Sequence, residues 1–158
     1  MAERSDHLLR TLATVAPGAR VVDAACGDGR HLDALARLGF DVWAVTDGDP
    51  APARRVLAES LGEEEAARRV TAADPDALGY PDAWADWAVL SDPDPAHLAD
   101  ALAEVRRVLR PGAWVWVEGP DAETLTTAAD AAYLAPSEEP QPEGDRWHAV
   151  FRRPGGVR

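Results

Sequence analysis

The chain has 158 residues, a size typical of one domain with one hydrophobic core. Its net charge of −12, from 16 basic and 28 acidic residues, argues against binding to nucleic acid, because such proteins usually display a basic face. No apolar run approaches the length of a membrane span, and the polar, mixed-charge N-terminus does not resemble a signal peptide. We therefore expect a cytoplasmic protein with neither a nucleic-acid nor a membrane partner. The single Cys26 fits a reducing compartment, and the lack of Lys, Asn and Ile indicates either a GC-rich genome or a designed sequence.

The first half of the chain predicts strands that alternate with helices. A short helix is expected over residues 5–15, with Ser5 as its N-cap and a stop at Pro17-Gly18. The elements expected next are a strand at 20–25, a helix at 30–38, a strand at 41–46 and a helix at 50–61. An acidic short turn or helix at 63–68 and a strand at 69–73 follow. This alternation is typical of parallel sheets.

The second half continues the same pattern after an irregular segment at 74–84. The expected elements are a strand at 86–91, a helix at 94–109, a strand at 113–118, a helix at 121–132 and a last strand at 147–152. A Pro/Glu-rich mobile loop is expected at 137–145 and a tail at 154–158, although a strand at 133–134 could also pair with the last one. The whole chain, 1–158, thus predicts a single α/β domain: a doubly wound, mostly parallel Rossmann-like sheet with helices on both faces.

The most informative stretch is Val-Val-Asp-Ala-Ala-Cys-Gly-Asp-Gly-Arg, residues 21–30. It combines a buried strand, an acid at the tip of that strand and a turn with two glycines, after which a helix begins. Glycine lets a ligand approach the backbone closely, and the start of the helix directs unpaired N–H groups toward it. In an open α/β sheet this turn lies where ligands bind.

Three motifs, in order and at compatible spacing, resemble class I S-adenosylmethionine-dependent methyltransferases of the type 11/25-like domain. The first is the glycine turn just described. The second is residues 74–90, which contain Tyr-Pro-Asp and then Ala-Asp-Trp-Ala-Val-Leu. The third is Glu-Val-Arg-Arg-Val-Leu-Arg-Pro-Gly, residues 104–112. The resemblance covers nearly the whole chain and implies S-adenosyl-L-methionine as cofactor.

The resemblance assigns the glycine turn to the amino acid end and ribose of the cofactor. Gly27 and Gly29 would allow the close approach, and Asp23 would accept a hydrogen bond from the cofactor's ammonium, directly or through water. An alternative role for Asp23 is to cap the turn that follows it. Ala25 stands where the family often has glycine, and Cys26 is interpreted as a small packing residue of the turn rather than as a nucleophile.

The remaining cofactor contacts are expected after the next strands. Thr46 or Asp47 would accept both ribose hydroxyls, with Asp47 preferred, and Asp74 would hold the adenine amino group. Pro75 has no backbone N–H to donate to the adenine ring, so adenine binding should be weakened by about 1 kcal/mol. Ser91 follows the fourth strand of the sheet, where the family places residues near the methyl group.

No catalytic base, nucleophile triad or metal-ligand cluster is evident, and the catalytic residues remain unknown. His31 and His97 are interpreted as surface or helix-start residues. Because the chain lacks the insertions that usually cover the acceptor, a homodimer or another partner could close the open pocket. The leading hypothesis is methyl transfer to a small molecule. The alternatives are an inactive methyltransferase-like partner or scaffold and, since Gly27-x-Gly29 also begins that fingerprint, a nicotinamide-dependent oxidoreductase.

Overall fold

The computed structural model describes residues 3–155. Its helices are α1 (Asp6–Leu12), α2 (Leu32–Arg37), α3 (Ala51–Leu61), α4 (Glu63–Arg69), α5 (Leu98–Val108) and α6 (Ala122–Ala131). Its strands are β1 (Arg20–Asp23), β2 (Asp41–Thr46), β3 (Val70–Ala72), β4 (Ala85–Leu90), β5 (Leu109–Gly119), β6 (Ala135–Glu143) and β7 (Arg146–Arg152). A 3-10 turn over Pro95–His97 precedes α5.

The strands form one sheet in the order β3-β2-β1-β4-β5-β7-β6. The first five strands of that order pair in parallel, whereas β7 runs antiparallel to both β5 and β6. The order reverses its direction between β1 and β4, which is where open α/β sheets bind ligands. The predicted doubly wound, mostly parallel α/β fold is confirmed.

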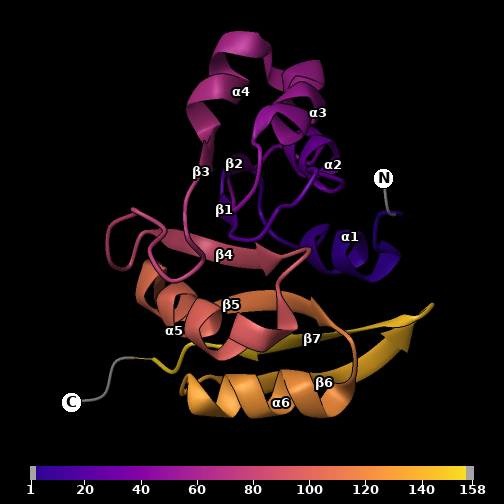
Figure 1. The fold of residues 1–158 in the computed structure, drawn as a ribbon, viewed down its shortest axis with the longest axis vertical. Helices are drawn as coiled ribbons and strands as arrows, with labels where there is room; N and C mark the ends of the chain where they lie inside the picture. Colours follow the sequence, from indigo (N-terminus) through magenta and orange to yellow (C-terminus); the bar gives the residue numbers. More distant parts are fainter. Residues whose placement is uncertain (1–2, 156–158) are drawn as a thin grey trace.

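Helices cover both faces of this sheet (Figure 1). One face packs against α5 and α6, with Leu102 and Leu125 fully buried there. The other face packs against α1, α2, α3 and α4, with Leu8, Leu35 and Leu57 fully buried. Each helix therefore buries one apolar stripe, as its sequence periodicity predicts.

The structure corrects the expected loop at 137–145. Residues 135–143 form β6, an edge strand that pairs with β7 through Glu138↔Val150 and Pro142↔Trp147, and the turn that joins the two strands lies at Gly144–Asp145. Proline is tolerated on an edge strand because one side of that strand needs no donors for the sheet. The composition therefore indicated a loop where pairing with β7 produces a strand.

Two other expectations concern the ends of the chain and the membrane. Of the expected tail at 154–158, residues 156–158 lie outside the described part of the chain, and 154–155 have no regular structure. Within residues 3–155, no helix combines the length and the apolar character that crossing a bilayer requires.

Candidate active site

The loops that follow β1, β2 and β4 meet at one edge of the sheet. The turn after β1 is tied to β2 by the Cys26 N–H, which donates to the Val45 carbonyl at 2.9 Å. It is tied to the loop after β4 by the Asp92 N–H, which donates to the Ala25 carbonyl at 2.9 Å. The chain segments that the sequence motifs single out are thus held side by side.

Two adjoining hollows lie between these loops, and the larger is a cavity of about 440 Å³. Six of the predicted site residues line them: Ala25, Gly27, Thr46, Asp47, Asp74 and Pro75. The volume falls in the range of small-molecule sites. The structure thus brings together residues that are up to 50 positions apart in the sequence, as the motifs predict.

The backbone at Gly27 approaches the loop after β4 closely. Its φ is +54°, and a Cβ atom placed there would lie 2.9 Å from the Asp92 Oδ2 atom. The nearest atoms all belong to the exposed Asp92 side chain, whose carboxylate can rotate away. Glycine at position 27 is therefore favoured mainly by the positive φ of the turn.

The remaining predicted residues, Asp23, Cys26, Gly29 and Ser91, do not line the hollows. The Asp23 side chain is completely buried, and its Oδ1 accepts from the N–H groups of Ala25 and Ser91, both at 3.3 Å. Its Oδ2 accepts from the Ser91 hydroxyl at 2.5 Å. These bonds match the capping role that the sequence left open for Asp23, because they fix the turn behind the cavity rather than reach into it.

Burial shifts the pKa values of Asp23 and Cys26 at this turn. Desolvation raises the pKa of Asp23 to about 6, and the hydrogen bonds from Ser91 and Ala25 oppose that rise because they favour the carboxylate. Burial also raises the pKa of the Cys26 thiol, so its reactive thiolate is disfavoured. Cys26 packs in the core beside Leu32 and Leu35, which agrees with a packing role.

The hollows are strongly acidic, a property that the individual motifs do not reveal. Their acidic lining residues are Asp47, Asp74, Asp76, Asp92, Asp94 and Asp100. The one basic lining residue among them is His97, exposed at the start of α5 and 3.9 Å from Asp94. The run of aspartates at 92–100 is visible in the sequence, but only the fold shows that it faces the glycine turn.

Comparison with known families identifies the chain. The sequence profile of a family described as "Methyltransferase domain" matches residues 21–112, which is more than half of the 158 residues. The protein belongs to this methyltransferase family. The matched residues include the glycine turn, the residues that line both hollows, and the motif at 104–112, which spans the end of α5 and the start of β5, so the predicted resemblance is confirmed. This assignment gives no support to the nicotinamide-dependent alternative.

Solved structures share the fold of this methyltransferase domain at low identity. A TehB-like S-adenosylmethionine-dependent methyltransferase from Corynebacterium glutamicum is 20% identical, with 92% of this chain and 85% of that chain covered at a TM-score of 0.70. The Burkholderia thailandensis 1,6-didemethyltoxoflavin-N1-methyltransferase, solved with S-adenosylhomocysteine, is 21% identical, with 92% and 78% covered at a TM-score of 0.68. The [4+2]-cyclase SpnF is 20% identical, with 96% and 81% covered at a TM-score of 0.69. No curated protein matches the sequence.

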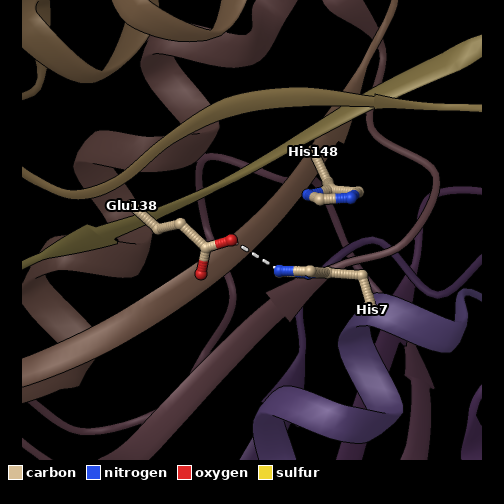
Figure 2. A group of neighbouring side chains, drawn as sticks. All are labelled: His7, Glu138 and His148. Atoms are coloured by element: carbon tan, nitrogen blue, oxygen red, sulfur yellow. Dashed lines mark hydrogen bonds and ion pairs between the residues drawn. The ribbon is translucent and has the colours of Figure 1, made fainter.

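A second cluster of polar side chains lies between α1 and the β6–β7 hairpin. His7, Glu138 and His148 meet there, and their nearest ligand atoms lie within 4.8 Å of one another (Figure 2). Sequence reasoning missed this group because His7 is more than 130 residues from the other two. Three such ligand atoms are the usual minimum for a metal site.

Hydrogen bonds account for His7 and Glu138 without a metal, whereas His148 Nδ1 is buried without a hydrogen-bond partner. The Trp116 indole N–H donates to His7 Nδ1 at 3.1 Å, so a neutral His7 carries its proton on Nε2 and donates it to Glu138 Oε1 at 2.6 Å. The His7 and His148 rings stack 3.8 Å apart at 15°. A metal ion lies near the plane of each imidazole that binds it, which two stacked rings do not allow. The cluster in this arrangement fastens α1 to the hairpin.

Proposed function

We propose that this protein transfers a methyl group from S-adenosyl-L-methionine to a small-molecule acceptor. The observation that carries the proposal is the pair of adjoining hollows that share Asp47, one lined by Gly27 and the other by Asp74, in a chain that belongs to a methyltransferase family. The low-identity relatives named above support the fold alone. The 1,6-didemethyltoxoflavin enzyme among them acts on a small molecule, which makes that acceptor class the reasonable one to test first.

The lining residues fit the parts of this cofactor. Ala25 and Gly27 of the turn line the smaller hollow, where they would contact the amino acid end. The exposed carboxylate of Asp47 accepts the two ribose hydroxyls, and Asp74 accepts the adenine amino group. The six aspartates around the cavity favour a ligand that carries a sulfonium and an ammonium.

The chain contributes mainly binding and orientation to the reaction. The cofactor supplies a methyl group that is already activated for in-line displacement, so holding the acceptor in line provides much of the rate acceleration. Gly27 and Asp47 fix the donor from two sides of the cavity. The acidic surroundings stabilise the positive charge of the bound donor before transfer. An acceptor that is nucleophilic in its neutral form then needs no base from the protein.

The first test is calorimetric titration of the purified protein with S-adenosylhomocysteine and, separately, S-adenosylmethionine. We expect micromolar binding, and we expect Asp47→Ala to weaken it at least about tenfold, because hydrogen bonds to a charged group contribute roughly 1.5–3 kcal/mol. Glu59→Ala removes the same charge from the exposed side of α3 and should leave affinity unchanged. A folded wild-type protein that binds neither ligand at millimolar concentration would refute the proposal.

A gain of affinity is expected for Pro75→Ala. Pro75 lines both hollows and lacks the N–H that could donate to an adenine ring nitrogen. Restoring that donor should strengthen binding of S-adenosylhomocysteine about fivefold, which corresponds to about 1 kcal/mol. Titration of adenosine provides the control, because it should show the same gain without the amino acid end. An unchanged or lower affinity for both ligands would show that the adenine does not bind beside Pro75.

The alternative function is a methyltransferase-like partner or scaffold without catalysis. The missing donor at Pro75 favours it, and so does the open cavity. Turnover separates the two functions: formation of S-adenosylhomocysteine from S-adenosylmethionine with a panel of small nucleophiles supports the enzyme. Binding without turnover, together with a stable complex or homodimer in size-exclusion chromatography, supports the partner. A cytoplasmic location and closure of the cavity by a second protomer remain predictions.

A further inference from the structure

A chain of buried hydrogen bonds links the N-terminal segment to the end of β1. The Ser5 backbone N–H donates to His31 Nε2 at 2.9 Å, His31 Nδ1 lies 2.6 Å from Ser91 Oγ, and the Ser91 hydroxyl donates to Asp23 at 2.5 Å. All four residues are at most 3% exposed. His31 does stand at the start of α2, as the sequence indicated, but it is in the core rather than on the surface.

The direction of each hydrogen bond follows from its end groups. A backbone N–H can only donate, so His31 Nε2 is the unprotonated nitrogen and the neutral ring carries its proton on Nδ1. That N–H donates to Ser91 Oγ, whose own hydrogen then points to the Asp23 carboxylate. Burial, with Arg30 and Arg4 nearby, lowers the pKa of His31 to about 3, so the ring stays neutral and this direction holds near neutral pH.

Asp23, the last residue in this series of hydrogen bonds, controls the shape of the cavity. Asp23 receives the N–H groups of Ala25 and Ser91, one on each of the two loops that form the cavity wall. The loop that follows Ser91 places Asp92 against Gly27. A change in the orientation of the Ser91 hydroxyl or of Asp23 would therefore move both walls of the cavity.

We propose that His31 is a positioning residue of the cofactor site, which acts through Ser91 on Asp23. His31 does not line the cavity, so it influences the ligand only through the two loops. The inference rests on the proposed function, because it assumes that the cavity binds S-adenosylmethionine. It adds that a buried residue outside the cavity sets the positions of the two loops that line it.

The test compares two variants that each keep one half of the imidazole. In His31→Asn the side-chain amide nitrogen occupies the place of Nδ1 and can still donate to Ser91. In His31→Gln the amide oxygen reaches the place of Nε2 and keeps only the bond from Ser5. We expect His31→Asn to bind S-adenosylhomocysteine within about threefold of the wild type and His31→Gln to bind about tenfold more weakly. Circular dichroism and thermal melting check that both variants fold.

The pH profile of binding supplies a second readout. The carboxylate form of Asp23 accepts the bonds that hold the loops, so affinity should fall below the pKa of Asp23, near pH 6. Hydrogen bonds to a carboxylate lower its pKa, so Ser91→Ala should shift the midpoint of this fall to higher pH. The charged and titratable groups that act on or lie beside Asp23 are Arg30, Cys26, Tyr80 and His31, and none of them is changed by this substitution.

Ser60→Ala is the matched control, because the Ser60 hydroxyl donates to Asp33 in an exposed serine–aspartate pair remote from the cavity. It should leave both affinity and pH midpoint unchanged. Equal affinities for His31→Asn and His31→Gln, or an unshifted pH midpoint in Ser91→Ala, would overturn the inference. Either result would mean that these hydrogen bonds only stabilise the fold. A folded wild type without binding at any pH would instead refute the proposed function, and the positioning role with it.

Discussion

Replacing Gly29 by alanine is expected to destabilise the protein by about 2–5 kcal/mol. Gly29 has a φ of +87°, a left-handed value that strains other residues. A Cβ atom there would lie 2.9 Å from the Ala53 Cα atom and 3.1 Å from its Cβ. Because Ala53 is a fully buried residue of α3, its backbone cannot move aside without opening the packing of that helix on the sheet.

Gly18→Ala separates the two causes of this effect. Gly18 has a similar φ of +90°, but nothing lies within 4 Å of the position that a Cβ would occupy. Gly18→Ala should therefore lower the free energy of unfolding only through backbone strain, by about 1–2 kcal/mol. Urea denaturation of both variants gives the difference directly. Equal decreases in the free energy of unfolding would mean that α3 can move aside without destabilising the protein. Backbone conformation alone would then require glycine at position 29.

The stability of His31→Asn relative to the wild type is expected to increase by about 3 kcal/mol between pH 7 and pH 4. His31 has an ordinary pKa of 6.5, and burial lowers it to about 3 in the folded protein. Between these two pKa values, the unfolded chain therefore binds a proton at His31 that the folded protein does not bind. The contribution of His31 to stability is complete above pH 6.5 and is lost progressively as the pH falls toward 3. Asparagine does not titrate, so the variant avoids this loss.

The comparison between variant and wild type is needed because Asp23 acts in the opposite direction. Its pKa is raised from 3.8 to about 6, so the folded protein takes up a proton first and gains stability as the pH falls through this window. The two effects partly cancel in the wild type, whereas only that of His31 is missing from the variant. Urea denaturation at several pH values measures both proteins. Parallel stability–pH curves would show that His31 is protonated in the folded state without penalty.

The sequence predicted most of the sheet because its local signals agree with the tertiary fold. The β-branched and apolar run at 41–46 forms β2 with the predicted bounds, and the pattern at 98–108 forms a helix within the predicted span. Pro17 and Gly18 lie in the connection between α1 and β1, since neither residue continues a helix. Pro111 and Gly112 follow the end of α5 but lie within β5, which begins at Leu109, earlier than the predicted strand at 113–118. The segment at 135–143 misled this reasoning, because its strand depends on hydrogen bonds from β7 rather than on its own composition.

The sequence by itself determined the order of strands and helices apart from β6, the glycine turn, and two acids, Asp47 and Asp74, that line the hollows, because these are local patterns with a fixed period or spacing. Only the tertiary structure decided which way those side chains point. It turned Asp23 away from the cavity toward Ser91, because a buried carboxylate is stable only where donors surround it. It also buried His31 and joined His7 to Glu138. Such long-range contacts arise when helices pack on a sheet, and residue spacing along the chain does not encode them.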